Sequence, residues 1–234
     1  MICGRCPRIA RASQPWALGR NPVGILGYRV DERDDRTTSV NPKSPDQDFE
    51  IFGYQEAFYI VSLLFCTESA LGSALRISDL LNQHKGGRFD FPPQPALDEL
   101  QNIALQGAGI SRFFWPPNKK HSKRGEILRK AFVVTEQSPL RSRDLRNRME
   151  HFDEYLDDFL KTCIAGQFIP DYFGPKPPDD RGPLRFFRAY FVNTGEFEIL
   201  GSIFVMQPIV NEIRRLHGLL IECEKAGSRF PRQS

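Results

Sequence analysis

The stretch that decides the fold is residues 57–65, which read AFYIVSLLF. Apart from one serine, every side chain in it is apolar or aromatic, and it lies inside a longer segment, 46–84, with helical spacing of apolar residues. A helix that is apolar nearly all round is normally buried on every side. The sequence therefore predicts a helix over 46–84 at the centre of a bundle, with Asp46 or Asp48 as its N-cap.

Three further helices are predicted downstream from helix start and stop signals. One covers residues 96–114, and another begins at Ser122. A fourth begins near Ser138, or a turn later at Ser142, and extends to Gly166. The apolar residues of this fourth helix fall within one arc of a helical wheel, namely Leu145, Met149, Phe152, Leu156, Phe159, Leu160 and Cys163.

The periodicity changes after the fourth helix. Residues 169–183 are rich in Pro, Gly and Asp and are predicted to form a loop. Two segments rich in Phe, Tyr, Val and Ile, 184–192 and 196–205, flank Asn193-Thr194-Gly195, which indicates a β-hairpin. A last helix opens at Pro208. We therefore predict a mainly α fold, a four-helix up-down bundle with a C-terminal β-hairpin and helix appended.

This pattern divides the chain into three regions. Residues 1–45 are predicted to be a flexible N-terminal extension, because Arg, Pro and Gly interrupt any period there. Its Cys3 and Cys6 form a CxxC, but no second pair follows at zinc-site spacing, so we interpret them as incidental thiols. Residues 46–166 are predicted to be the helical bundle, and 167–234 the hairpin plus helix.

The composition favours a folded protein of the cytoplasm. The 234 residues are 40% hydrophobic and include 19 phenylalanines, enough to bury a core. A net charge of +3 permits an anionic partner without requiring one. Five cysteines, an odd count, do not resemble a disulfide framework. With no secretory signal and no apolar run longer than about ten residues, we expect a cytoplasmic protein without a membrane span.

Residues 146–151, which read RNRMEH, carry the strongest catalytic signal. Arginine can hold a phosphate, and histidine can move a proton near neutral pH, so the pair suggests metal-independent chemistry on a phosphodiester. On one helix Asn147, His151 and Tyr155 share a face, whereas Arg146 points roughly 140° away from His151. A second copy of the chain, or an irregular first turn, is therefore needed to bring both groups to one phosphate.

The pattern Arg146-Asn147-x-x-x-His151 on the last of four predicted helices resembles the HEPN superfamily. The resemblance implies a homodimer formed through the motif helix and, in many members, a metal-independent endoribonuclease of toxin–antitoxin or defence systems. His151 would then be the general acid or base, Arg146 would stabilise charge on phosphorus, and Asn147 would orient His151 or hold a phosphate oxygen. Arg148 and Tyr155 are secondary candidates.

The same resemblance implies an RNA substrate, an antitoxin or other partner protein, a product with a 2′,3′-cyclic phosphate, and no cofactor or metal. Some toxin members carry a tyrosine two residues after the histidine, but Asp153 stands there in this chain, so that regulation is not carried over. Because several carboxylates surround His151 and oppose the approach of RNA, the alternative is a non-catalytic HEPN-like dimeric binding or scaffold module. A further interpretation is a solvated helix whose arginines and carboxylates form salt bridges.

A second, weaker signal is a basic loop that follows an aromatic cluster. Basic charge beside aromatic rings can contact single-stranded RNA, although such aromatics often only close a core while the lysines stay in solvent. The candidate nucleic-acid contacts are Lys119, Lys120, Lys123 and Arg124.

Overall fold

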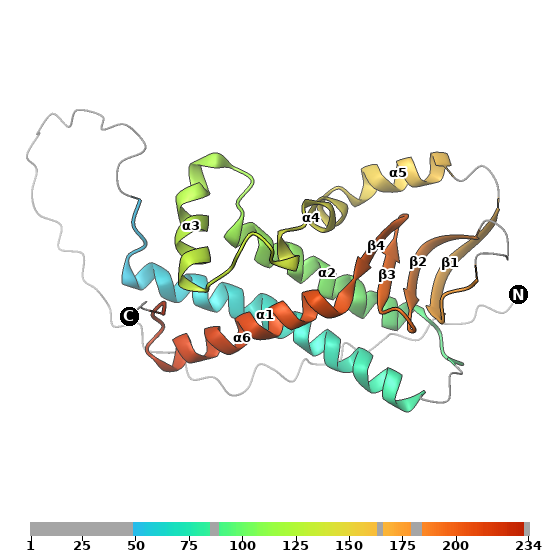
Figure 1. The fold of residues 1–234 in the computed structure, drawn as a ribbon, viewed down its shortest axis with the longest axis horizontal. Coiled ribbons are helices and arrows are strands. Elements are labelled where there is room, and N and C mark those ends of the chain that lie inside the picture. Colours follow the sequence, from blue (N-terminus) through green and yellow to red (C-terminus); the bar gives the residue numbers. More distant parts are fainter. Residues whose placement is uncertain (1–48, 85–88, 163–165, 179–183, 232–234) are drawn as a thin grey trace, which may run out of the picture. The chain divides into compact units, whose positions relative to one another are not determined.

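The structure, a computed structural model, describes residues 49–84, 89–162, 166–178 and 184–231. Within these ranges it contains six α-helices, two 3₁₀ turns and one four-stranded sheet, so the fold is mainly helical (Figure 1). In chain order the elements are α1 (Gly53–Gln83), α2 (Gln94–Phe114), η2 (Lys119–His121), α3 (Ser122–Ala131), η3 (Pro139–Arg141), α4 (Arg143–Glu150), α5 (Phe152–Thr162), β1 (Gln167–Gly174), β2 (Leu184–Phe191), β3 (Glu196–Ile199), β4 (Ser202–Val205) and α6 (Met206–Lys225).

By their contacts, residues 1–45 and 46–234 form two separate units. The predicted N-terminal extension, with Cys3 and Cys6, lies outside the described residues. The prediction that Asp46 or Asp48 caps the first helix is wrong, because α1 begins at Gly53 with Phe52 as its N-cap. The sheet and α6 share one hydrophobic core with α1 and α2. The C-terminal segment is thus packed into the same unit as the helices.

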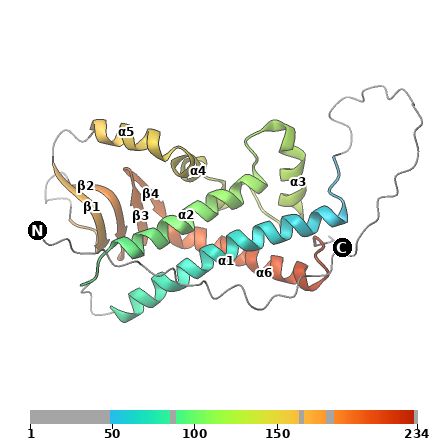
Figure 2. The same cartoon turned by 180° about the vertical axis from the view of Figure 1, so that it is seen from behind.

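Three long helices, α1, α2 and α6, lie side by side in both views (Figures 1 and 2). The 31-residue α1 is continuous through Gly72 and buries Ile60 and Leu63 against its neighbours. Its opposite face is not covered, because Phe58 and Phe65 are 67% and 70% exposed. The prediction that this segment is buried on every side is therefore wrong. Its two long neighbours cover only one side of the helix.

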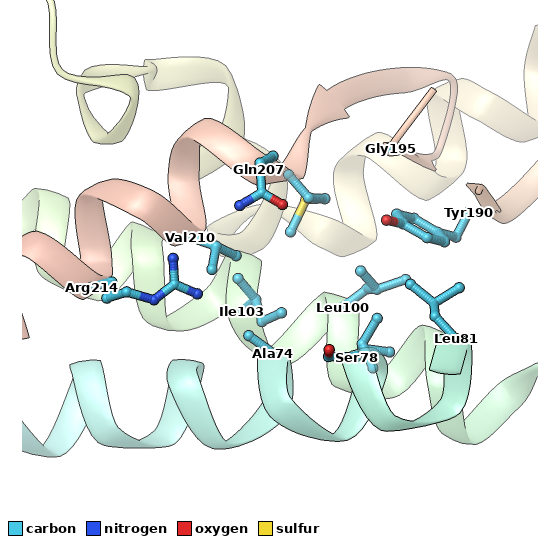
Figure 3. Close-up of a pocket in the computed structure, with 12 residues that line it drawn as sticks. Ala74, Ser78, Leu81, Leu100, Ile103, Tyr190, Gly195, Gln207, Val210 and Arg214 are labelled. Atoms are coloured by element: carbon cyan, nitrogen blue, oxygen red, sulfur yellow. The ribbon is translucent and has the colours of Figure 1, made fainter. Parts of the chain in front are cut away.

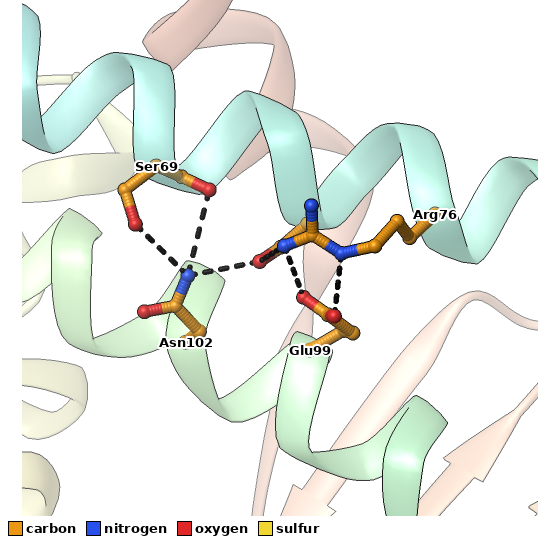
Figure 4. Close-up of polar contacts among 5 residues, drawn as sticks. Ser69, Arg76, Glu99 and Asn102 are labelled. Carbon is orange, nitrogen blue, oxygen red and sulfur yellow. Dashed lines mark hydrogen bonds and ion pairs between the residues drawn. The ribbon is translucent and has the colours of Figure 1, made fainter. Parts of the chain in front are cut away.

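By length and composition α1 is the one described helix that could cross a membrane, although 33% of its most apolar window is buried inside the protein. Polar side chains tie its inner face to α2 (Figure 4). Asn102 donates hydrogen bonds to Ser69 Oγ at 3.2 Å and to the buried Ser73 Oγ at 2.8 Å. Arg76 Nη2 donates to Glu99 Oε2 at 2.7 Å. These bonds fix the register of the two helices.

The sheet has the order β1-β2-β3-β4 and contains a strand that the sequence did not predict. Residues 167–174, mostly assigned to a loop, form β1, which pairs in parallel with β2, as Tyr172 opposite Ala189 illustrates. Pro170 is compatible with this strand because β1 is an edge strand, where a missing N–H donor is tolerated. The loop prediction is wrong here because pairing with a distant strand outweighed the local turn composition.

The predicted hairpin forms between β2 and β3, which pair antiparallel around Asn193-Thr194-Gly195. The second predicted strand, 196–205, is divided into β3 and β4 by a two-residue turn. Leu200 and Gly201 both have positive φ, at 50° and 74°, as a tight hairpin turn of this kind requires. The sequence did not indicate this second turn, because leucine rarely adopts a positive φ.

The predicted fourth helix is divided into two. Both proposed starts are used, since Ser138 Oγ accepts a hydrogen bond at the start of η3 and Ser142 Oγ accepts one from Leu145 N at the start of α4. At His151 the backbone has φ −116° and ψ 42°, far from helical values, and α5 begins at the next residue. Leu160 at the far end is 55% exposed, because α5 no longer continues the axis of α4.

Candidate functional site

His151 lies at the corner between α4 and α5. Its backbone N–H donates to Asn147 O at 2.8 Å, and its carbonyl accepts from Tyr155 N at 3.1 Å. The imidazole is 52% exposed, and its Nδ1 lies 3.4 Å from Glu154 Oε1. A histidine in this position is open to solvent and can exchange protons with a ligand that approaches from outside.

Arg146 points inward from α4, away from this corner. Its side chain is only 13% exposed, and Nη1 donates to the carbonyl of Trp115 at 3.3 Å. Its buried Nε has no hydrogen-bond partner, since the closest carboxylate oxygen, Glu150 Oε1, is 3.9 Å away. Glu150 is instead held by Arg112 at 2.7 Å. Arg146 therefore keeps donor capacity that the described residues do not use.

The three motif residues do not converge within one copy of the chain. Arg146 contacts the end of α2, whereas His151 contacts only its own α4–α5 segment among the described residues. Asn147 is partly exposed and forms no side-chain hydrogen bond with the described part of the chain. The expected arrangement, in which one phosphate meets both Arg146 and His151, is thus absent from the single chain.

The secondary candidates Arg148 and Tyr155 contact each other and the sheet. The Arg148 guanidinium lies 3.9 Å from the centre of the Tyr155 ring and donates to Leu200 O at 3.3 Å and to Ser202 Oγ. These contacts anchor the α4–α5 corner to the β3–β4 turn, so Arg148 has a structural role. Beside the pair is a hollow of about 430 Å³ that also contains Glu198, whose pKa is raised by burial.

The structure places Arg146 in a hollow of about 350 Å³ together with two arginines that the sequence did not single out. We call it the arginine hollow, and Arg129 of α3 and Arg141 of η3 complete its cationic lining. Its volume lies within the range of small-ligand sites, roughly 300–1,000 Å³. The remaining lining residues are Trp115, Pro116, Pro117, Ser122 and Glu126.

Hydrogen bonds hold the arginine hollow together around Trp115. The carboxylate of Glu136 lies 2.7 Å from Arg141 Nε and 3.6 Å from Arg129 Nε, and it accepts from Trp115 Nε1 at 3.4 Å. The Arg129 guanidinium stacks 5.8 Å from the Trp115 ring and donates to Phe114 O. Glu136 is thus shared by two guanidinium groups, and the lining of the hollow contains three arginines and the carboxylate of Glu126.

This arrangement can bind an anion. Guanidinium groups bind phosphate or carboxylate through paired N–H donors, and the three arginines come from separate elements that enclose one space. No histidine lines the hollow. An imidazole that transfers a proton at an anion bound there would therefore come from outside the hollow, whereas Glu126 is a carboxylate within its lining.

The basic loop leads directly into this site. Lys119 and Lys120 lie exposed on η2, immediately before Ser122, which lines the arginine hollow. Lys123 pairs with Glu126 at 3.6 Å on the exposed surface. Arg124 differs from the lysines, because it donates to Arg112 O at 3.0 Å and packs over an aromatic ring of α2. Arg124 thus ties α3 to α2, and its role as a nucleic-acid contact stays a prediction.

A second hollow, of about 230 Å³, lies between α1, α2, α6 and β2 (Figure 3). Its lining is mostly apolar, and the phenol of Tyr190, whose pKa burial raises, and the guanidinium of Arg214 are among its few polar groups. None of the candidate site residues named from the sequence lines it. Its chemistry indicates a small apolar ligand at most.

Arg129 and Arg141 escaped the sequence analysis because no spacing relates them to Arg146. They belong to different elements, and each looks like an ordinary solvated arginine in its own segment. Among the described residues, no group of three or more His, Cys, Asp or Glu side chains is arranged to hold a metal ion. Comparison of the chain with protein-family models, curated proteins and solved structures finds no match.

Proposed function

We propose that the protein is a HEPN-like, metal-independent endoribonuclease whose arginine hollow holds an RNA phosphate. The observation that carries the proposal is the meeting of Arg146 with Arg129 and Arg141 in one open hollow. Lys119 and Lys120 of η2 are exposed and precede Ser122, a lining residue, by three and two positions, so they add positive charge to the same segment.

In this reaction the ribose 2′-oxygen attacks phosphorus, and the bond from phosphorus to the 5′-oxygen breaks. His151 removes the 2′-proton or protonates the leaving oxygen, and Arg146 stabilises the negative charge that develops on the phosphate. The products are a 2′,3′-cyclic phosphate and a free 5′-hydroxyl.

The proposal requires a second copy of the chain. Because His151 is 52% exposed while Arg146 faces the hollow, the imidazole of one copy would act at the arginine hollow of the other. The proposal treats α1, α2, α3 and the divided α4–α5 pair as the four-helix arrangement of the family, with an antitoxin or partner protein as regulator.

A second candidate function is a non-catalytic HEPN-like dimeric binding or scaffold module. The hydrogen bond from Arg146 to Trp115 O favours it, because this bond ties the guanidinium to the fold and away from His151. Such a module would bind a phosphate-bearing partner in the arginine hollow without cleaving it.

Incubation of the purified protein with diverse single-stranded RNAs in EDTA tests the proposal. We expect cleavage that ends in 2′,3′-cyclic phosphates and that falls at least about 100-fold in His151→Ala, the size typical of a lost general acid or base. Arg141→Ala should also cleave more slowly, whereas Arg214→Ala, which removes an arginine that lines the second hollow and not the arginine hollow, should cleave normally. Binding without cleavage would favour the scaffold module, and equal cleavage by His151→Ala would refute the proposal.

A further inference from the structure

The N-terminal half of α1 exposes a continuous row of large apolar side chains. Tyr54, Phe58, Val61 and Phe65 are between 58% and 70% exposed. Their spacing of four, three and four residues places them on one face of the helix, opposite the face that packs on α2 and α6. We call these four residues the α1 stripe. Phe52 extends it, with its ring stacked 6.2 Å from that of Tyr54.

The size of this surface is that of a protein interface. Together with Phe52, the α1 stripe exposes on the order of 600 Å², if a whole aromatic side chain contributes about 200 Å². Contiguous apolar patches on soluble monomers rarely exceed a few hundred Å². Stable interfaces bury about 600–1,000 Å² on each partner, so the available area reaches the lower end of that range.

The chemistry of the α1 stripe favours a protein over a lipid surface. Between residues 49 and 75 the only charged residues are Glu50, Glu56 and Glu68, with no Lys or Arg. Helices that lie on membranes carry basic residues beside the apolar face, and anionic headgroups repel carboxylates. Ser62, beside the stripe, donates its hydroxyl to Phe58 O at 2.7 Å, so burying it leaves no free donor.

We propose that the α1 stripe is the surface through which two copies of this chain associate, with their α1 helices antiparallel across a two-fold axis. The 4-3-4 spacing is that of helices that interdigitate side chains, and a two-fold interface needs only one self-complementary patch. An axis between Phe58 and Val61 sets each Phe58 against Val61 of the second copy and each Tyr54 against its Phe65.

The inference does not depend on the proposed ribonuclease activity. In both overall views α2 lies between α1 and α4 (Figures 1 and 2). The α1 stripe lies on the face of α1 opposite its buried residues, which pack on α2 and α6. Dimerisation through the motif helix, which the family resemblance implies, would use another surface. Variants on the two surfaces can therefore separate the two forms of association.

Sedimentation equilibrium of the full chain at low to high micromolar concentration tests the inference. We expect association of the 26.8 kDa chain, which gives a dimer of twice that mass where the α1 stripe alone mediates it. Phe58→Glu and Phe65→Glu should each raise the dimer dissociation constant at least about 30-fold, as truncation of an aromatic hot spot does. Both sites are exposed, so circular dichroism should report an unchanged fold. Leu160→Glu, at an exposed apolar site on α5, is the control and should keep the association through the α1 stripe.

Three results would overturn the inference. The first is a wild-type protein that stays monomeric at high concentration. The second is a dimer that survives Phe58→Glu but is lost in Leu160→Glu, which would place the interface on the α5 side. The third is a monomer that sediments with phosphatidylcholine vesicles in a manner that Phe58→Glu abolishes, which would assign the α1 stripe to a lipid surface.

Discussion

A methyl group added at Gly125 should disturb both the stability of the protein and the arginine hollow. Gly125 lies inside α3 at the point where this helix approaches the end of α2. A Cβ atom there would lie 2.5 Å from Phe114 O, 2.7 Å from Pro116 Cδ and 3.2 Å from Arg129 Nη1. Because a backbone carbonyl and a proline ring cannot rotate away, α3 must move outward in Gly125→Ala and carry Arg129 with it.

Two opposing effects set the size of the change. Replacing glycine by alanine inside a helix stabilises it by about 1 kcal/mol, whereas forcing extra volume into a packed contact costs about 1–3 kcal/mol. Contacts below 3 Å to two rigid groups place this site near the upper end of that cost. We therefore expect a net loss of about 1–2 kcal/mol, which lowers the Tm of a protein of this size by about 3–6 °C.

Thermal and urea unfolding followed by circular dichroism measure this loss. The matched control is Gly218→Ala on the exposed side of α6, where an added Cβ has no neighbour within 4 Å. Only the helix propensity changes there, so this variant should gain about 1 kcal/mol. The same substitution should therefore lower the free energy of unfolding at Gly125 and raise it at Gly218. A Gly125→Ala protein as stable as Gly218→Ala would refute the close contact between α3 and α2.

Other sites give further predictions. The ring of Phe197 in β3 is fully buried, so Phe197→Ala should lower the free energy of unfolding by about 3–5 kcal/mol, measured by urea unfolding. A loss below about 1 kcal/mol would contradict the packing of the sheet on the helices. The Arg215 guanidinium lowers the pKa of Glu212, so the stability that this ion pair contributes is present above the ordinary pKa of 4.5 and is lost as the pH falls further. Glu212→Gln should therefore flatten the acid side of the stability–pH curve. An unchanged curve would count against the ion pair between Glu212 and Arg215. Burial raises the pKa of the Cys223 thiol, so the thiol should react slowly with an alkylating reagent. At pH 8 we expect alkylation, followed by peptide mass spectrometry, to be at least about tenfold slower in native than in urea-unfolded protein. Equal rates would show that the thiol is accessible.

Local signals in the sequence were sufficient for most helices and for the first hairpin. Ser138 and Ser142 are capping residues in the structure, as proposed, and Asn193-Thr194-Gly195 forms the turn between β2 and β3. Each of these features depends on residues a few positions apart. A single sequence contains that information directly.

The misses share a dependence on distant partners. Strand β1 exists because residues 167–174 pair with β2, and no local pattern in a segment that contains Pro170 indicates such a strand. The arginine hollow joins side chains of three elements, whose proximity only the folded chain creates. The outward face of α1 was misjudged because an apolar sequence does not reveal whether its partner is the same chain or another molecule.

The candidate motif has one feature that the local sequence predicted and others that depend on distant contacts. Arg146 and His151 were found from their spacing, but the backbone break at His151 and the inward course of Arg146 were not. An ideal helix was assumed across a corner that Arg148 fixes to the β3–β4 turn. An ideal helix already sets the two groups about 140° apart, and the hydrogen bond from Arg146 to Trp115 O ties the guanidinium to the end of α2.

The central claim is that the arginine hollow binds an RNA phosphate, and equilibrium binding of a fluorescent single-stranded RNA tests it most directly. Polarisation titrations should show binding that weakens as salt rises, since bound phosphates release counterions. Arg141→Gln should weaken binding about tenfold, the worth of a charge-assisted hydrogen bond, while Arg214→Gln should bind like the wild type. No binding by the wild-type protein, or equal losses in Arg141→Gln and Arg214→Gln, would contradict the account.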